Sequence, residues 1–553
     1  MVITGNPVSA NGLQGSQLLS KRSLLSRRDV LAVLGASLTI GHLAACRADN
    51  STPRSKNQGR LELLLEEPAT IDPGLAAQTQ EATVAEALFE PLVHTIGNGA
   101  VEPAAAESWQ VTADGQAYEF RLRNDRRWTT GEEVTSEDFI WAWKRNLDPE
   151  FGATLNYLFF PITGAEKFAK TGNDQDQFGI MAPERHVITV RLTYRCPSFL
   201  SRTATSAFAP LPRGEIEGLG AYWAKPGNMR GNGPYKLVQW DKGRGMSLHP
   251  NTYYTGPPAL FSDVVIRFSD GQAATAEAFR RGPAHAAEMS PTAYNTAKAT
   301  KDLRPLLRLY ERTGTSFIVL NTRKPPWHSS AVRLALSLAL DRKQLIANAF
   351  DQAALPSNRL VPSTVLSNQN QQSPDIAAAR TLLDDAGFTG RKRPPPLRLT
   401  YYRTEQGDRI THELARQWNE ALGLKVESDA RDWGSFRSFT THPDDFDAYQ
   451  ADWYSPYRHP QSWYEEIWHS DVDRFQSGWT NAAFDKLLET ATSASAARQY
   501  DAYVAADDIL NSETPAIPIG NFASAFLIKP GVTSFAINPV SGAIDLTKIK
   551  ITA

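Results

Sequence analysis

The residues that could carry chemistry in this chain form no familiar catalytic pattern. Ten histidines are scattered over 553 residues, and the segment that begins at His412 lacks the second histidine of a His-Glu-x-x-His zinc motif. There is no Gly-x-Ser-x-Gly nucleophile elbow, and no Gly-Lys-Ser/Thr follows the Gly-Asn-Gly-Pro turn at 231–234. Cys196 has no basic cluster near it in sequence to hold a thiolate. We therefore expect no enzyme, no bound metal and no cofactor.

The most unusual stretch is Gln450–Trp468, which reads QADWYSPYRHPQSWYEEIW. It joins a row of aromatic side chains to the basic side chains of Arg458 and His459. Flat aromatic walls give a ligand contact area at little cost in rotamer entropy, and they also build protein cores. The adjacent carboxylates Glu465 and Glu466 lie on a predicted helix, where a solvated face is the default interpretation. The stretch alone leaves a core, a ligand wall and a partner surface as alternatives.

Composition narrows the class of protein. The chain is 41% hydrophobic and 21% charged, with a net charge of −2 and a pI near 6.6. Such a length and apolar content support roughly two to four folding units. The charge balance gives no basic field for nucleic acid, and no nucleic-acid-binding motif is visible. With two cysteines, Cys46 and Cys196, the fold depends on hydrophobic burial rather than on a disulfide framework.

Residues 1–45 read as an export signal. A basic region precedes the moderately apolar stretch Val30–Ala45, which is short for a membrane span. Leu43-Ala44-Ala45-Cys46 resembles a bacterial lipobox, and Ser26–Leu31 resembles a twin-arginine motif. We expect a lipid on Cys46, a flexible tether over residues 46–59, and an extracytoplasmic lipoprotein anchored to a membrane and exported by the twin-arginine route. A small transmembrane anchor with an incidental cysteine is the alternative.

The rest of the chain alternates predicted strands with predicted helices. The apolar run after Arg60 predicts a buried strand, and the period-2 pattern of Tyr118, Phe120 and Leu122 predicts a half-buried one. Helices are predicted over 136–147, with a cap at Thr135 or Ser136, and as one continuous helix over 329–350. This alternation indicates α/β domains built on mixed sheets.

In this order the motifs resemble those of the oligopeptide- and dipeptide-binding proteins of ABC importers, family 5 of the extracytoplasmic solute-binding proteins. The resemblance covers nearly all of residues 60–553. The segments that carry it are EALFEPLV, AESWQVTADGQAYEFRLRNDRRWTTGEEVTSEDFIWAWKR, GNGPYKL, LNTRKPPWHSSAVRLALSLALDR and ADWYSPYRHPQSW.

The resemblance implies a two-lobed periplasmic-binding-protein fold of class II, of the large three-domain type, with mixed β-sheets and a hinged ligand cleft. Lobe 1 would combine 60–96, 204–308 and 523–553, with an inserted domain at 97–203, and lobe 2 would be 309–522. The monomeric protein would capture oligopeptides in the cleft and deliver them to the permease and ATPase subunits of an ABC importer.

The resemblance also implies which residues meet the ligand. Binding peptides of varied sequence requires affinity from backbone groups met by a receptor strand, with side chains in hydrated pockets. Trp433 and Trp453 match ligand-side tryptophans, whereas Trp463 and Trp468 are expected in a core. The expected ligand-binding residues are Ala77, Gln78, Thr79, Trp433, Gln450, Asp452, Trp453, Tyr454, Ser455, Tyr457, Arg458, Asn521 and Phe522.

The chain departs from the family at Pro456. Oligopeptide binders place an aspartate there, three residues after the tryptophan that matches Trp453, and it pairs with the ligand's α-ammonium. A proline forms no ion pair and has no N–H, and Gln450 is neutral where the family has a basic contact. Two interpretations stay open: Arg458 and His459 select an anionic or N-blocked ligand, or Asp452 takes over the ammonium.

Other functions stay open on the sequence alone, because a fold does not fix its ligand. One is a binding protein of the same fold for a metal chelate, haem, an opine-like compound or an oligosaccharide. Another is a lipoprotein that senses a solute without transporting it. An undetected hydrolase is the least favoured.

Overall fold

The structure is a computed structural model that describes residues 58–96, 99–173, 178–367, 373–390, 392–441, 446–493 and 496–552. The export signal, Cys46 and most of the expected tether lie outside these residues.

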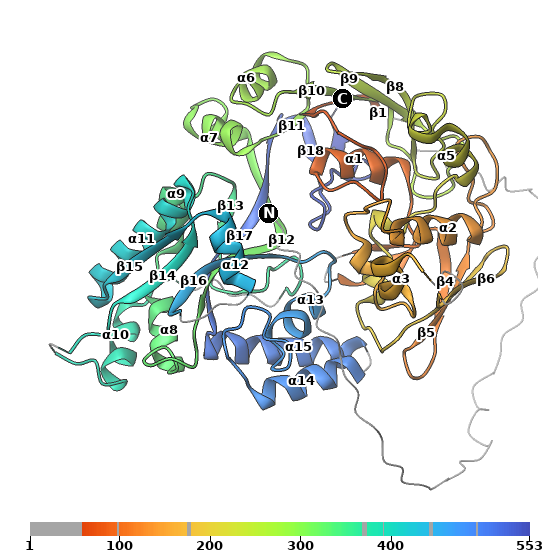
Figure 1. Ribbon diagram of the computed structural model, residues 1–553. Coiled ribbons are helices and arrows are strands. Elements are labelled where there is room, and N and C mark those ends of the chain that lie inside the picture. The colour runs from red at the N-terminus through yellow and green to blue at the C-terminus, as the bar shows by residue number, and fades with distance from the viewer. Residues whose placement is uncertain are drawn as a thin grey trace, which may run out of the picture. The chain divides into compact units, whose positions relative to one another are not determined.

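One large sheet runs through the molecule (Figure 1). Its strands are β1 (Gln58–Glu66), β8 (Tyr235–Asp241), β9 (Gly245–Pro250), β10 (Phe261–Ser269), β11 (Ala286–Glu288), β12 (Leu307–Leu320), β13 (Ala354–Pro356), β14 (Leu397–Tyr402), β15 (Val426–Arg431), β16 (Ala448–Tyr454) and β17 (Ala516–Ile528). Their order is β15-β14-β16-β12-β17-β11-β1-β10-β9-β8, and β13 pairs with β17. Parallel and antiparallel pairs both occur, so the sheet is mixed as predicted.

The long strands β12 and β17 connect the two halves of this sheet. The start of β12 pairs with the end of β17, through Leu307 opposite Leu527, and the end of β12 pairs with β16. The end of β17 also pairs with β11, through Phe526 opposite Glu288. The register of β12 and β17 shifts between Glu311 and Thr315, which marks a bulge in the connecting pair.

We call β1, β8–β11 and their helices the first part. The apolar run predicted as a buried strand is β1, where Leu61 and Leu63 have no exposed surface. The remaining elements of this part are α1 (Thr79–Leu88), β2 (Val93–Thr95), β3 (Val101–Pro103), α5 (Arg213–Leu219), α6 (Ala274–Arg281), α7 (Pro291–Ala299), β18 (Val532–Ser534) and β19 (Lys550–Ile551).

A four-stranded sheet is inserted into the first part and shares its hydrophobic core. Its order is β4 (Ala106–Val111), β5 (Ala117–Leu122), β7 (Val187–Arg191) and β6 (Ile180–Glu184), and it is accompanied by α2 (Ser136–Leu147), α3 (Ala165–Thr171) and α4 (Phe199–Arg202) (Figure 1). The inward side of β5 is confirmed, since Tyr118, Phe120 and Leu122 are buried. The cap of α2 is confirmed at Thr135, which forms a capping box with Asp138.

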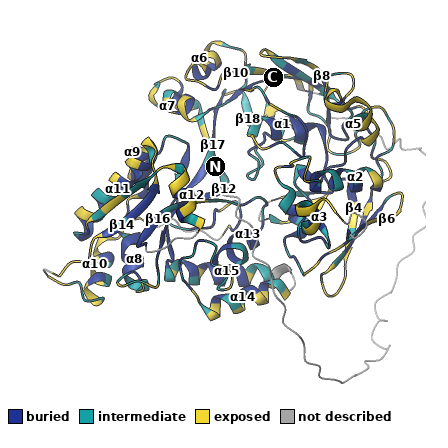
Figure 2. Cartoon of the chain, in the orientation of Figure 1, coloured by how far each residue is buried: buried dark blue, intermediate teal, exposed yellow. Residues whose placement is uncertain are grey.

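We call β13–β16 and their helices the second part. Its helices are α8 (Ser330–Leu338), α9 (Arg342–Ala349), α10 (Ile376–Asp385), α11 (Glu405–Leu422), α12 (Trp433–Thr441), α13 (Gln461–Trp463), α14 (Ala482–Ser493) and α15 (Ala496–Glu513). Two hydrophobic cores cover the two faces of the sheet, one with α8–α11 and one with α12–α15. Figure 2 shows β14 and β16 buried while α9, α10 and α11 carry exposed residues on one side.

The single helix predicted over 329–350 is wrong. It divides into α8 and α9 because Asp341 caps a new helix, with its carboxylate accepting a hydrogen bond from the backbone N–H of Gln344 at 2.9 Å. An aspartate that caps competes with helix continuation.

Candidate functional site

One edge of β16 has no strand partner over Gln450–Tyr454. On one side, β16 pairs with β12 along its whole length, from Ala448 opposite Leu320 to Tyr454 opposite Gly314. On the other side, β14 pairs with β16 only at Ala448 and Tyr449 and then continues with β15. No strand of the described chain adds to this edge. It therefore offers backbone N–H and C=O groups to an extended ligand.

Aromatic side chains lie on this edge and on the elements next to β16. Trp433, at the start of α12, packs edge-on against Tyr402 with ring centres 5.1 Å apart. On the α8–α11 face, Tyr454 stacks on Phe522 at 4.6 Å, and burial raises the pKa of the Tyr454 hydroxyl. Trp453 points to the opposite face, toward the α12–α15 core. Alternation along a strand thus places aromatic surface on both sides of the free edge.

Ala77, Gln78 and Thr79 form the N-terminus of α1 in the first part. The Glu81 carboxylate accepts the backbone N–H groups of Ala77 at 2.9 Å and Gln78 at 3.0 Å. Ala77 and Gln78 are exposed and Thr79 is half-buried. This segment lies at the surface, with its first two N–H donors already engaged by Glu81.

A short stretch of β12 lies against Tyr454 and close to Gly542, which is also a neighbour of Thr79. A Cβ added to Gly314 would lie 2.5 Å from the Tyr454 ring, so only glycine allows that ring to cross the strand. Two residues earlier, Arg312 packs close to Gly542, where an added Cβ would lie 2.4 Å from the arginine and 2.8 Å from the hydroxyl of Thr79. Tyr454 thus adjoins Gly314 of β12, and Thr79 shares the neighbour Gly542 with Arg312, two residues earlier on the same strand.

Four of the expected ligand residues are buried instead: Ser455, Tyr457, Asn521 and Phe522. The Asn521 amide donates to Glu311, and its oxygen accepts from Thr315. The Tyr457 hydroxyl accepts from Arg202 at 3.0 Å and donates to Glu466. These groups hold the protein together around the site, and their direct contact with a ligand stays a prediction.

Arg458 and His459 are occupied by the protein. The Arg458 guanidinium donates to the backbone oxygens of Thr364 and Ile96, the latter at 3.1 Å. His459 is buried, and burial lowers its pKa to about 4, so the imidazole is neutral at pH 7. These contacts give no support to the interpretation that the pair selects an anionic ligand.

The polar residues at the edge are few. Asp452 is exposed and Gln450 is half-buried, and both lie on the face opposite Trp453 because side chains alternate along the strand. Pro456 is half-buried just past the end of β16 and offers no charge. Asp452 is thus the carboxylate within the free edge itself.

Sequence reasoning missed two residues beside the expected ones. Tyr402 ends β14 and packs against Trp433, and its position as the last residue of a strand before a turn was the available signal. Arg474 lies 4.5 Å from the centre of the Trp453 ring, and no sequence pattern links these two positions.

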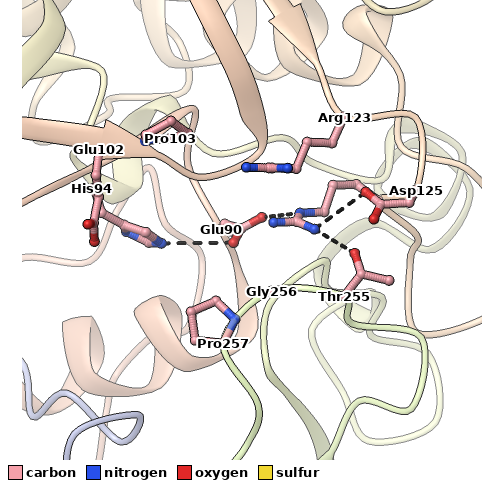
Figure 3. A pocket seen from close by; sticks show the side chains of 10 residues that line it. Glu90, His94, Glu102, Pro103, Arg123, Asp125, Thr255, Gly256 and Pro257 are labelled. Carbon is pink, nitrogen blue, oxygen red and sulfur yellow. Dashed lines mark hydrogen bonds and ion pairs between the residues drawn. The ribbon is translucent and has the colours of Figure 1, made fainter. Parts of the chain in front are cut away.

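A separate cavity of about 370 Å³ lies beside β2, β3 and the loop at 255–257 (Figure 3). Its buried Glu90 accepts a hydrogen bond from Arg126 at 2.7 Å and another from the Tyr254 hydroxyl. Arg123 donates to the backbone oxygen of Ala104 at 3.0 Å. Because these charged groups bind one another and the backbone, we interpret the cavity as a place where structural elements meet rather than as a ligand site.

Within the described residues, no three histidine, cysteine, aspartate or glutamate side chains gather where a metal ion could bind. None of the helices described is both long and apolar enough to span a bilayer.

Comparison with known proteins identifies the family. The model for bacterial extracellular solute-binding proteins, family 5 (middle), matches residues 100–474. The chain is 28% identical over 525 residues to the periplasmic murein peptide-binding protein MppA of Escherichia coli, covering 92% of this chain and 95% of that protein. It is also 28% identical over 484 residues to the probable deoxycholate-binding periplasmic protein YgiS of Escherichia coli, covering 85% and 89%.

The solved structure of MppA in its unliganded open form matches with a TM-score of 0.80 and 26% identity, over 90% of this chain and 98% of that one. The expected resemblance and the two-lobed α/β fold are both confirmed. The chain belongs to family 5 of the bacterial extracellular solute-binding proteins, and it is an extracytoplasmic binding protein.

Proposed function

We propose that this protein captures oligopeptides at the free edge of β16 and delivers them to the permease of an ABC importer. The observation that carries the proposal is the unpaired edge at Gln450–Tyr454, flanked by aromatic rings. An extended peptide added to this edge gains main-chain hydrogen bonds whatever its sequence. The names of relatives, murein peptide-binding MppA and oligopeptide-binding OppA, support the same ligand class.

In this proposal the ligand lies between two lobes that close around it. Lobe 1 combines 60–96, 204–308 and 523–553, the inserted domain is 97–203, and lobe 2 is 309–522. The position of Tyr454 against Gly314, and of Thr79 beside Gly542 where Arg312 packs, supports a ligand path beside the connecting strands. The exposed surfaces of Ala77, Gln78 and Asp452 and the half-buried Thr79, Gln450, Trp433 and Trp453 would line that path.

The proposal includes a lipid anchor on Cys46 after removal of residues 1–45. The order of basic region, apolar stretch and lipobox supports it. The tether would keep the binding protein near its permease, and export would follow the twin-arginine route.

A non-peptide ligand is the second candidate. The relative YgiS is named as a probable deoxycholate-binding protein and aligns over 85% of this chain. The stacked pair Tyr454–Phe522 and the Trp433 ring are surfaces on which a rigid apolar solute would lie.

Native mass spectrometry of the gently purified protein without residues 1–45 tests the peptide proposal. We expect a series of adducts at peptide masses. One of these sequences is then synthesised twice, once unmodified and once N-methylated at alternate amides. Because the strand edge binds backbone N–H groups, we expect N-methylation to weaken binding by at least about tenfold.

Two results would contradict the proposal. A single discrete non-peptide adduct, or tight binding of deoxycholate with none of the peptides, would favour the second candidate. Equal binding of the methylated and unmethylated peptides would show that the edge of β16 is not the docking surface.

A further inference from the structure

Arg474 lies against Trp453, a residue of the free edge of β16. The guanidinium of Arg474 stacks over the Trp453 ring at 4.5 Å from its centre. The indole N–H of Trp453 is buried and finds no hydrogen-bond acceptor among the described residues. A buried donor without a partner costs stability, and Trp453 shares this feature with Trp463, Trp468 and Trp479 of the same core.

Arg474 has no acid partner of its own in the part of the chain that is described. No carboxylate there lies within 4.0 Å of its guanidinium. Glu466, the acid that influences it from farther away, is taken by Arg202 at 2.7 Å and by Tyr457. Burial lowers the pKa of Arg474, and the more distant Glu466 offsets only part of that effect.

The protein holds Arg474 in place by its neighbours on both sides. The Asp473 carboxylate accepts from the backbone N–H groups of Ser477 and Gly478, each at 2.8 Å, and closes a tight turn. Phe475 is buried, and its carbonyl accepts from the Tyr449 hydroxyl at 2.7 Å. The backbone N–H of Arg474 itself donates to Ile467 at 3.1 Å. A fixed backbone lowers the entropic cost of using this cation for binding.

We infer that Arg474, held against the Trp453 ring, donates hydrogen bonds to a carboxylate of the bound ligand. This inference rests on the proposed peptide-binding function and narrows its ligand class to peptides with an acidic side chain or a free carboxyl end at this point. A guanidinium and a carboxylate form the strong, charge-assisted type of hydrogen bond.

The test uses a panel of C-terminally amidated tetra-alanine peptides in which each position in turn carries Glu or the isosteric Gln. Tetra-alanine with a free carboxyl end is compared with its amidated form, which tests whether the site binds a terminal carboxylate. Calorimetric titration compares the wild type with Arg474→Gln, Arg474→Lys and the control Arg498→Gln, which removes the same charge from an exposed arginine of α15.

We expect one position at which the carboxylate form binds the wild type about tenfold or more tightly than its neutral partner. That preference should fall to less than twofold in R474Q, persist in R498Q and be retained at least in part in R474K. The neutral peptides should bind R474Q and the wild type alike, which verifies that the variant is folded.

Two outcomes overturn the inference while leaving peptide binding intact. One is the absence of a Glu-over-Gln or acid-over-amide preference at every position of the wild type. The other is a preference that survives in R474Q. If no member of the panel binds the wild type, the proposed function itself fails, and this inference fails with it.

Discussion

Glu465 shows how the surroundings of one carboxylate set its protonation. Its Oε1 accepts from the Tyr503 hydroxyl at 2.7 Å, whereas Oε2 is buried without a hydrogen-bond partner among the described residues. Burial raises its pKa to about 8. The expectation of a solvated helix face for Glu465 was therefore wrong, because the residue lies in a π-helical turn, Tyr464–Trp468, packed against α15.

This raised pKa predicts a pH-dependent stability. Glu465 releases its proton near pH 4.5 in the unfolded chain and near pH 8 in the folded protein. The stabilisation of the fold by protonated Glu465 is therefore fully present below about pH 4.5 and is lost as pH rises to about 8. At pH 8.5, Glu465→Gln should be more stable than the wild type by about 2 kcal/mol, and at pH 4.5 it should be little different. Urea unfolding at both pH values measures this.

The control for that comparison is Glu489→Gln, which changes an exposed carboxylate of α14. An E465Q variant whose stability relative to the wild type is the same at both pH values would refute the assigned protonation.

At the residue scale, sequence reasoning succeeded where side-chain type decides the environment. Trp463 and Trp468 were expected in a core, and both are confirmed there with at most 1% exposure. It did not foresee that the Tyr457 hydroxyl binds both Arg202 and Glu466, which lie far apart in sequence, and contact of Tyr457 with a ligand stays a prediction. Contacts between distant segments leave no local pattern for a single sequence to report.

Among the elements, the segment Ser455–Glu466 connects the two parts in addition to β12 and β17. Tyr457 belongs to the hydrophobic core of the first part although the segment continues β16. The Gln461 side chain accepts from the backbone N–H of Ser198 at 3.0 Å. Arg202 stacks on the Tyr457 ring at 4.3 Å and donates to Glu466 at 2.7 Å. This segment therefore fixes one edge of the second part to the inserted sheet's domain.

Removing Arg202 should loosen that connection. Arg202→Ala leaves Glu466 and the Tyr457 hydroxyl without their buried partner, so we expect a loss of about 3 kcal/mol in the free energy of unfolding. Because the two parts would then be coupled more weakly, their urea transitions should also separate when followed by tryptophan fluorescence and circular dichroism.

Arg213→Ala provides the comparison, since that arginine pairs with Glu217 at 2.9 Å on an exposed helix and should cost about 0.5 kcal/mol or less. Similar losses for the two variants would contradict a connecting role for Arg202.

The elements themselves were largely predictable, because period and caps are local. The strands β1 and β5 and the cap of α2 followed from such patterns. The free edge of β16 did not, since it depends on where β14 leaves its neighbour after Thr400. Which strand pairs with which, and for how long, is decided by packing across the whole sheet.

For the molecule as a whole, the lipobox before Cys46 predicts attachment to a membrane. In a bacterial host, the full-length protein should sediment with membranes, and Cys46→Ser should move to the soluble fraction because the acyl-bearing residue is gone. The matched control is Cys196→Ser, since Cys196 is buried at 1% exposure and takes part in no disulfide. Equal sedimentation of the C46S variant and the wild type would refute the anchor.

The first part is built from both ends of the chain, and this determines when it can be completed during synthesis. Its strand β11 needs β17, through Phe526, and its core needs Ile544 and Ile549 beside Leu61. Chains emerge from the ribosome N-terminus first. All residues of β14–β16 and their helices have therefore been synthesised before β17, the strand that the first part still lacks. The half that begins the sequence is the half that finishes folding.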